Sequence, residues 1–203
     1  MTPAMRPTAP LPVETKGSVV RSLALTLVAH QLLDGVAAAV SPPARAMLLD
    51  PPLPTQWIDG RVLNEILEAI LQIHGSEVLR RLNRESIERG VSPLIRGVAE
   101  SLLRVFGVSP ATLLSRMSRV GGTMSRGVLY HYTADTETSG AFELEYPALV
   151  DVPLGASIAT VGGLDLVFDM CAVRGTFGPP VVVANGRRNR VSFAVKWRAA
   201  RDP

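Results

Sequence analysis

The sequence of 203 residues contains only one cysteine, Cys171. One thiol cannot form an intramolecular disulfide, and it excludes the zinc sites that are built from several cysteines. A chain without disulfides suits a reducing compartment, so we expect a cytoplasmic protein.

Long hydrophobic runs are also absent. The most apolar stretch, residues 19–40, is interrupted by His30, Gln31 and Asp34, and only residues 23–29 within it form a charge-free apolar core. This core is far shorter than the ~20 apolar residues that cross a bilayer as a helix. We therefore expect no membrane span, and we predict one buried amphipathic helix over residues 19–40.

Recognisable catalytic motifs are missing as well. The chain has no Gly-x-Ser-x-Gly elbow, and Gly162-Gly163 is not followed by the Lys-Ser/Thr of a phosphate loop. Glu143 and Glu145 project from the same face of a predicted strand, but they alternate with apolar residues as an ordinary solvated face does. The residues therefore favour a binding protein over an enzyme.

Three histidines are present, and none lies near a second ligand at metal-binding spacing. His30 and His74 fall in or at the ends of predicted helices, and His131 falls on the more polar face of a predicted strand. One histidine can hold a haem iron, so this alternative stays open at the level of the sequence. Because no partner orients any of the three, we expect no metal and no cofactor.

The charge of the chain is modest. Charged residues make up 19% of the sequence against 47% apolar residues, which indicates a globular domain. The net charge of +3 is not gathered into a basic stripe. Arg187, Arg188 and Arg190 cluster at a predicted hairpin tip, but no aromatic side chains lie between them to stack on bases. We expect no nucleic-acid binding.

Prolines and glycines divide the chain. Four prolines in residues 1–15 predict a disordered arm, and residues 16–203 have the length of a single domain. Asp59 can cap a helix that ends at Gly75, and Ser76 can cap the next one. The sequence Gly-Val-Ser-Pro then occurs at 90–93 and 107–110, where it is predicted to end one helix and begin the next.

The hydrophobic period changes from 3.6 to 2 at Val128. Strands are predicted near 128–135, 140–146, 180–185 and 191–197, and a crossover helix is predicted from Pro153 to about residue 173. No strand is expected before residue 120. An N-terminal helical region followed by a four-stranded antiparallel sheet with a crossover helix is an α+β fold.

Four short segments carry a resemblance to a known family. They are Lys16-Gly17 before the first helix, Trp57, the run Ser109-Pro110-Ala111-Thr112-Leu113-Leu114, and the final strand Val191–Trp197. In this layout the chain resembles a family of proteins of similar length and unknown function found mainly in myxobacteria. That family is akin to the superfamily of haem-NO-binding-like, 4-vinyl-reductase and Golgi-transport ligand-binding domains.

The resemblance implies a pocket between helices and sheet that takes a small or acyl-chain ligand, and pairing through helices. The chain lacks the Tyr-x-Ser-x-Arg signature of the haem sensors and the cysteine-rich cluster of some vinyl-reductase-type domains. We therefore expect a non-enzymatic sensor or binding module with a helix–sheet pocket for an apolar small molecule. The predicted pocket residues are Trp57, His131, Gly162, Gly163 and Cys171.

Two of these predictions have a structural alternative. Gly162 and Gly163 lie inside a predicted helix, where each glycine costs about 1 kcal/mol relative to alanine. They either allow a close packing contact or a helix break, or let the backbone approach a ligand. Cys171 likewise contacts a ligand or fills space as a small buried hydrophobe.

The rival hypothesis is a homodimeric interaction scaffold without a ligand. The helix after Asp59 carries Leu71 beside its main apolar stripe, and the first helix carries Leu25 and Leu32-Leu33 outside its main face. Exposed apolar patches usually mark interfaces, and two-fold pairing is the commonest way to bury them. A protein partner other than a second copy is a further alternative.

Overall fold

The computed structural model describes residues 13–90, 109–147, 152–184 and 188–199. Most of the predicted proline-rich arm lies outside these ranges. So do most of the first Gly-Val-Ser-Pro phrase and the first two residues of the second.

Helices come first along the chain and strands dominate its second half. The helices are α1 (Gly17–Ala29), α2 (Leu33–Ala38), α3 (Pro42–Leu49), α4 (Gly60–Gly90), α6 (Pro110–Met124), α7 (Leu154–Leu164) and α8 (Leu166–Met170). The strands are β1 (Glu14–Lys16), β2 (Trp57–Asp59), β3 (Ser125–Arg126), β4 (Leu129–Thr136), β5 (Ser139–Pro147), β6 (Val173–Phe177), β7 (Val181–Ala184) and β8 (Arg188–Ala199). The predicted α+β class is confirmed.

The larger sheet has the order β4-β5-β8-β6, and β7 pairs with β8 beside β6. Its pairings are antiparallel, and the four predicted strands are confirmed as β4, β5, β7 and β8. Strand β6 was not predicted, because only Phe177 at its end is buried and its other residues show no apolar alternation. The predicted crossover helix is two helices, α7 and α8, separated at Asp165, and it ends at Met170 instead of residue 173.

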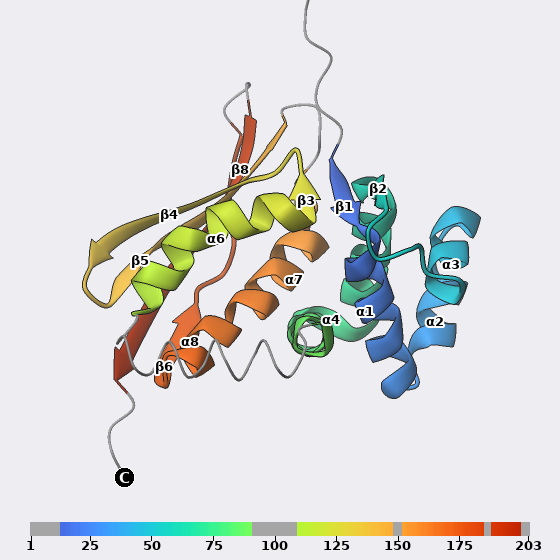
Figure 1. Ribbon diagram of the computed structural model, residues 1–203, viewed down its shortest axis with the longest axis horizontal. Helices are drawn as coiled ribbons and strands as arrows, with labels where there is room; N and C mark the ends of the chain where they lie inside the picture. The colour runs from blue at the N-terminus through green and yellow to red at the C-terminus, as the bar shows by residue number, and fades with distance from the viewer. Residues whose placement is uncertain (1–12, 91–108, 148–151, 185–187, 200–203) are drawn as a thin grey trace, which may run out of the picture.

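One face of this sheet carries the core, as the alternation predicted. Phe142, Leu144 and Tyr146 of β5 are buried, and so are Val191, Phe193, Val195 and Trp197 of β8. Figure 1 shows α6, α7 and α8 lying across the sheet. The residues between the buried ones point to the opposite, outer face, because successive side chains of a strand alternate.

A smaller sheet has the order β2-β1-β3 and corrects two predictions. Strands do occur before residue 120, and Glu14 and Thr15 form part of β1 although they were assigned to the disordered arm. Strands of two or three residues are too short to show a hydrophobic period, so the sequence pattern could not reveal them. Antiparallel pairing of Thr15 with Ile58 ties the start of the domain to the segment before α4.

The predicted helix over residues 19–40 is wrong in one respect, because it is two helices. Gln31 adopts a left-handed backbone conformation with φ of 58°, and it separates α1 from α2. The amide of Leu32 reaches back to the carbonyl of Leu27 at 2.9 Å, which closes the end of α1. Apolar residues continue on both sides of the break, so their period concealed it.

Three predicted helix boundaries are confirmed in detail. Asp59 Oδ1 accepts a hydrogen bond from the amide of Arg61 at 2.9 Å at the start of α4. Gly75 interrupts α4 with a φ of 80°, a conformation that glycine adopts at little cost. Ser109 accepts a bond from the amide of Thr112 at 3.3 Å, and Pro110 occupies the first turn of α6.

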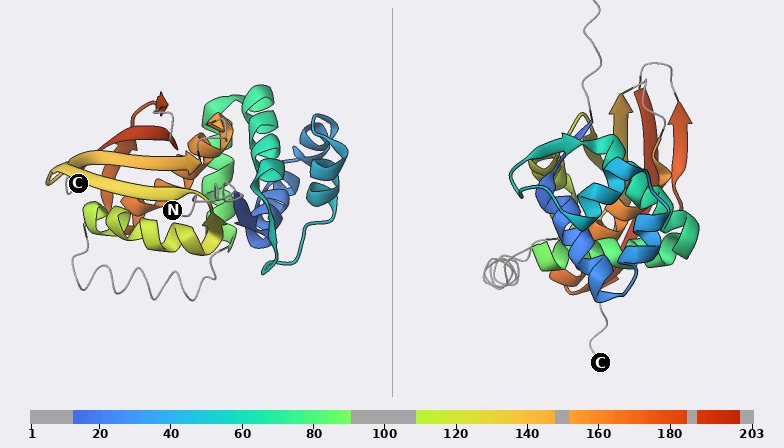
Figure 2. Two further views of the ribbon diagram at one scale, coloured as in Figure 1. Left: turned by 90° about the horizontal axis from the view of Figure 1, so that it is seen from above. Right: turned by 90° about the vertical axis from the view of Figure 1, so that its right-hand side faces the viewer.

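The buried side chains form two clusters. The first, here called the helical core, lies among α1, α2, α3 and α4, and the second, the helix–sheet core, lies between the larger sheet and α6, α7 and α8. Figures 1 and 2 show α1, α2 and α3 at one end of the molecule and the sheet at the other. Helix α7 joins them, because Ala159 packs in the helical core and Val161 in the helix–sheet core.

In the part of the chain that the structure describes, no helix combines the length and the apolar character needed to cross a membrane.

Candidate functional site

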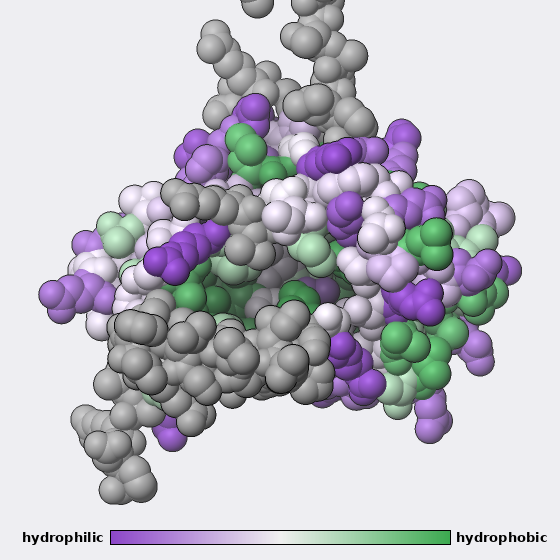
Figure 3. Space-filling model, viewed as in Figure 1, coloured by the Kyte–Doolittle hydropathy of each residue, from purple (hydrophilic) through white to green (hydrophobic). Residues whose placement is uncertain are grey.

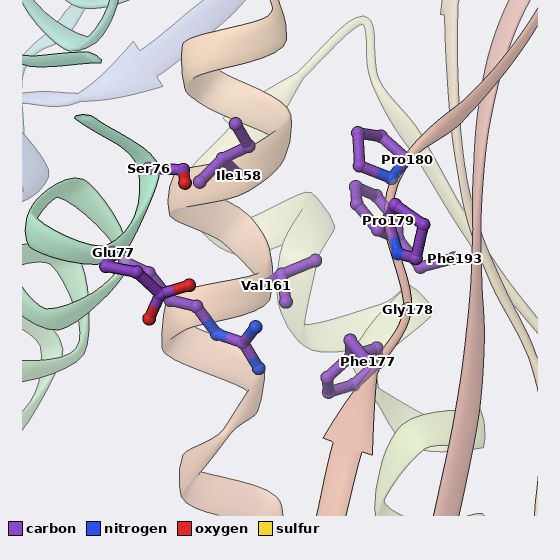
Figure 4. Close-up of a pocket in the computed structure, with 10 residues that line it drawn as sticks. Ser76, Glu77, Ile158, Val161, Phe177, Gly178, Pro179, Pro180 and Phe193 are labelled. Carbon is purple, nitrogen blue, oxygen red and sulfur yellow. The ribbon is translucent and has the colours of Figure 1, made fainter.

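A cleft opens where α4, α7 and the connection between β6 and β7 meet. Its volume is about 290 Å³, and its walls come from both helices and from the sheet. The lining residues are Ser76, Glu77, Arg80, Ile158, Val161, Phe177, Gly178, Pro179, Pro180 and Phe193. Figure 4 shows Val161 projecting from α7 toward Phe177 and Gly178, while Ile158 lies beside Ser76 of α4.

Local sequence features hold the two helices of the cleft close together. A Cβ atom added at Gly155 would lie 2.8 Å from the backbone of Leu67 and Glu68, and one at Gly162 would lie 2.2 Å from the carbonyl oxygen of Arg80. Only glycine permits so close an approach of α7 to α4. The kink at Gly75 begins the second part of α4, which brings Ser76 to the mouth of the cleft.

The opposite wall is made by two prolines. Gly178 donates its amide to the carbonyl of Ala194 at 2.7 Å, but Pro179 and Pro180 have no amide hydrogen and cannot continue the ladder. The edge of the sheet is therefore interrupted between β6 and β7. The proline rings then line the cleft beside Phe193.

The polar end of the cleft is an ion pair. Arg80 Nε and one terminal nitrogen each donate to a different oxygen of Asp165 at 2.6 Å, a bidentate arrangement. The Asp165 side chain is only 14% exposed. Hydrogen bonding to Asp165 raises the pKa of Arg80 above its ordinary value, so this guanidinium stays charged and already has its partner. Glu77 and Ser76 add the other polar groups.

The described lining is mostly apolar, with a few polar groups at one end. The described walls contain one hydroxyl, one carboxylate and one paired guanidinium, and no histidine or cysteine stands beside Ser76 to activate it. The remaining walls are aliphatic side chains, phenylalanine rings and prolines. An apolar body with one polar group fits such a surface.

A second feature of the helix–sheet core is a set of buried hydroxyls. Tyr130 and Ser125 share a hydrogen bond of 2.7 Å, and the hydroxyls of Tyr146 and Ser157 lie 3.3 Å apart. Ser157 also donates to the carbonyl of Pro153 at 2.9 Å. Burial raises the pKa of Tyr130 and of Tyr146, so both phenols stay neutral at ordinary pH. The Tyr146–Ser157 bond joins β5 to α7, and the Tyr130–Ser125 bond joins β4 to β3.

Helices α6 and α7 lie on the same face of the sheet but barely touch each other. Figure 3 shows a hollow with apolar side chains at its floor on the side of the molecule where these helices lie in Figure 1.

Of the predicted pocket residues, Trp57 lies in β2 of the smaller sheet. Lys16 Nζ lies 4.1 Å and Arg126 Cζ 3.9 Å from the centre of its ring. These cation–π contacts hold the smaller sheet together. Trp57 is not part of the cleft lining.

His131 lies on the outer face of β4, opposite Glu143 of β5. Its Nε2 is 3.6 Å from Glu145, and 47% of its side chain is exposed. The side chain therefore points away from the helix–sheet core.

Gly162 and Gly163 lie in α7, where the packing alternative explains their positions. Gly162 contacts the backbone of Arg80, and an added Cβ at Gly163 would meet the end of the Ile87 side chain at 2.2 Å. Gly162 stands beside the cleft residue Val161, although neither glycine is itself in the lining.

Cys171 follows α8 and is half-buried. Burial raises the pKa of its thiol, so it is not an activated thiolate. The five predicted residues thus lie among different neighbours, and the structure does not gather them into one cavity. Sequence reasoning missed Ile158, Val161, Pro179 and Pro180. The signal was the Pro-Pro pair between two predicted elements, together with the inward position of Phe193.

No protein-family model matches the chain, and no curated protein matches it. Solved structures do match, and they are H-NOX domains. One is a mutant of the T. tengcongensis H-NOX, with 15% identity, coverage of 92% of this chain and 100% of that one, and a TM-score of 0.60. Another is the Fe(II) unliganded H-NOX protein from K. algicida, with 9% identity, coverage of 93% and 99%, and a TM-score of 0.62. A third is an oxygen-binding H-NOX domain related to soluble guanylate cyclases, with 14% identity, coverage of 93% and 97%, and a TM-score of 0.58. The chain therefore has an H-NOX-like fold.

The matching H-NOX structures include haem and Fe(II) proteins, so the described residues can be tested for a haem ligand. The cleft lining contains no histidine, cysteine, methionine or tyrosine, the residues that bind haem iron. His30 Nε2 lies 2.7 Å from Glu85, and His131 is on the outer face. The buried Nε2 of His74 has no hydrogen-bond partner, but His74 precedes the kink at Gly75 and does not line the cleft. The residues that the structure describes do not fit a haem.

Proposed function

We propose that this protein is a binding module that holds an apolar small molecule, without haem, in the cleft between α4, α7 and the β6–β7 connection. The observation that carries the proposal is the composition of the lining. Ile158, Val161, Phe177 and Phe193 supply apolar walls from two helices and the sheet, and the polar groups are confined to α4. Small-molecule sites commonly combine apolar walls with a few polar groups in this way.

The size of the cleft limits the ligand. A volume of about 290 Å³ is close to the lower end of the range of ligand pockets, roughly 300 to 1,000 Å³. A compact ring system or a short acyl chain would fit better than a tetrapyrrole. Its polar group would lie near Ser76 and Glu77, because Arg80 is engaged by Asp165.

Binding can be tested with an apolar dye and two matched variants. Ile158→Trp places a large ring in the cleft, whereas Leu154→Trp adds the same ring four residues earlier on the same helix, where the side chain is exposed and outside the lining. We expect Nile red to become fluorescent on the wild type and on Leu154→Trp, and to bind at least tenfold more weakly to Ile158→Trp. Equal binding to all three would place the dye elsewhere and contradict the proposal.

The absence of haem is a prediction of its own. Mixing the protein with haemin should give no Soret band of a coordinated haem, because no described histidine faces the cleft. A Soret band that disappears in His74→Ala would contradict this, since His74 has the one histidine nitrogen in the described chain that is buried and unpaired.

A homodimer is the second candidate, and the exposed side of α1 favours it. Leu25 and Val28 are 57% and 55% exposed, and they are three residues apart on one face of the helix. The exposed apolar surface is smaller than the sequence predicted, because Leu32, Leu33 and Leu71 pack against the helical core. If α1 forms a dimer, light scattering at tens of micromolar should give twice the monomer mass. Leu25→Glu should reduce the measured mass to that of a monomer. Monomer mass in the wild type would contradict this candidate.

Two predictions, the family membership and the cellular location, rest on the sequence alone. Membership of the myxobacterial family rests on the four short segments that carry the resemblance. The cytoplasmic location rests on the single cysteine. Both remain proposals.

A further inference from the structure

The outer face of the larger sheet falls into two electrostatic halves. Alternation along β8 places Arg190, Ser192, Ala194, Lys196 and Arg198 on this face, opposite to the buried Val191, Phe193, Val195 and Trp197. None of the described helices covers it, because α6, α7 and α8 pack on the inner face. Its charges are therefore available to solvent or to a partner.

In the first half every acidic group is matched by basic groups. Arg188 Nε lies 3.0 Å from Glu145, and Arg190 lies 3.4 Å from Glu143 and 3.7 Å from Glu145. His131 is 3.6 Å from the same Glu145. This half carries little unbalanced charge.

The second half, which we call the basic face, consists of Arg174 of β6 with Lys196 and Arg198 of β8. All three are exposed, and none makes an ion pair with any residue that the structure describes. Arg174 and Arg198 are direct cross-strand partners, a like-charge arrangement that destabilises a sheet. Lys196 is flanked by Thr176 on one side and Ser139 on the other, so its neighbours supply no carboxylate.

One carboxylate lies in the turn at the end of this region. Glu137 follows β4 and is exposed, and so is Asp135 at the end of β4, but neither forms an ion pair with Lys196 or Arg198 in the described chain. The basic face therefore keeps its positive charge within the described chain. A cluster that is not neutralised and holds two like charges side by side is expected where an anionic partner supplies the missing charge.

Exposed apolar side chains lie on the same outer face. Val181 and Val183 of β7 are 57% and 49% exposed, and they pair with Ser192 and Arg190, which point outward. Val181 is thus four residues from Lys196 along the sheet, or about 14 Å. The outer face combines unpaired cations with protruding valines.

We propose that the basic face docks on a lipid bilayer that contains anionic headgroups. Charge complementarity carries the proposal, because each lysine or arginine near an anionic membrane surface adds favourable energy. The valines would enter the headgroup region, a contact that a highly hydrated polyanion does not offer. Nucleic acid is the weaker partner, because no aromatic side chain lies among the three cations to stack on a base. If the ligand in the cleft derives from a lipid, the protein would then take it from the bilayer on which it docks.

The test is co-sedimentation of the full chain with vesicles of phosphatidylcholine alone or mixed with phosphatidylserine. We expect binding to the mixed vesicles only, and binding that weakens as salt is raised. Combining Arg174→Gln, Lys196→Gln and Arg198→Gln should reduce the partition constant by about 100-fold, since each basic residue contributes about a factor of five. The double variant Arg174→Lys/Arg198→Lys keeps the charge and should retain binding.

The matched control removes the same charge elsewhere. Arg21, Arg81 and Arg116 are exposed on α1, α4 and α6, away from the outer face, and their joint replacement by glutamine should weaken binding far less than the triple variant does. Circular dichroism should show that both triple variants remain folded. The proposal is overturned if the wild type ignores anionic vesicles, if it binds neutral vesicles equally well, or if the two triple variants weaken binding alike. Preferential binding to an oligonucleotide or to polyglutamate, with no binding to vesicles, would overturn it as well.

Discussion

The helical core and the helix–sheet core are built from different side chains. In the described part of the chain, the helical core consists of aliphatic residues and alanines, among them Leu23, Leu27, Ile66 and Ile70, with no aromatic ring among them. The helix–sheet core holds the buried aromatic rings, including Phe142, Phe168, Phe177, Phe193 and Trp197. Leucine and isoleucine in helical spacing fill the space between helices closely.

Rings on a sheet pack differently. Phe142 and Phe177 meet edge to face with centroids 6.4 Å apart, and Phe168 and Phe177 are 5.4 Å apart. Glycines make room for rings at three positions: Gly121 beside Tyr130, Gly140 beside Tyr132 and Gly175 beside Phe168. The cleft opens at the margin of this aromatic core. Under the proposed function, the helical core serves as the scaffold, and the ligand enters at the margin of the helix–sheet core.

The largest effects should come from removing one large side chain from each core. Phe193→Ala should lower the free energy of unfolding by about 3–5 kcal/mol, and Ile70→Ala by about 2–5 kcal/mol. Because α4 and α7 share the most extensive helix–helix contact, we expect both variants to unfold in one transition. Chemical denaturation followed by circular dichroism and by tryptophan fluorescence checks this. Two separate transitions would show that the cores are independent.

Substitutions at two neighbouring glycines test how closely α7 packs on α4 between the two cores. In Gly162→Ala the new methyl group meets the backbone oxygen of Arg80, which cannot move aside, so a loss of about 1–3 kcal/mol is expected. In Gly163→Ala it meets the flexible end of Ile87, and the gain in helix propensity of about 1 kcal/mol can offset the crowding. Thermal unfolding should show a clear loss for the first variant only. Equal losses would contradict the close crossing of α7 over α4.

Removing the Tyr146 hydroxyl tests the polar contact inside the helix–sheet core. Tyr146→Phe loses the bond to Ser157 and should cost about 1 kcal/mol, while Ser157 keeps its bond to Pro153. Burial raises the pKa of Tyr146 in the folded state, so the unfolded chain loses this proton first as the pH rises above about 10. The wild type should therefore lose stability in that range, and Tyr146→Phe should lose less. Identical slopes against pH would contradict the burial of the phenol.

The smallest effect is expected on the outer face, far from both cores. Glu145 contacts Arg188, Arg190 and His131, but these partners are 41% exposed or more. Glu145→Gln should cost only about 0.5–1 kcal/mol at low salt and less at high salt. Denaturation at two ionic strengths measures the difference. A larger, salt-independent loss would show that these ion pairs are structural.

The sequence predicts this architecture where its patterns are long. The alternation along β5 and along residues 191–197 of β8 identified the strands and their inward faces. Arg188 and Arg190, predicted at the hairpin tip, lie instead in β8, which begins at Arg188. The cap at Asp59, the kink at Gly75 and the start of α6 at Pro110 followed from single residues with strong conformational preferences. Strands β1, β2, β3 and β6 were missed because they are short or carry almost no buried residue.

The cleft was harder to predict than the fold. It joins Ser76, Val161, Pro179 and Phe193, which are distant in the sequence and are brought together only by the packing of α7 on α4. Gly162 was chosen for its unusual place in a helix, and that place is explained by the helix contact. Trp57 and His131 were chosen by residue type and lie in other parts of the molecule. Local patterns specify elements, whereas a cavity depends on how those elements pack.

The most direct test of the binding function is native mass spectrometry of the purified protein, since it reports bound mass without a choice of ligand. We expect the wild type and Leu154→Trp to carry an additional mass of a small organic molecule that is released on denaturation. Ile158→Trp should appear as the bare chain, because its indole occupies the cleft. A wild type that shows only the mass of the polypeptide after purification, and that takes up no apolar compound when mixed with such compounds, would contradict the account.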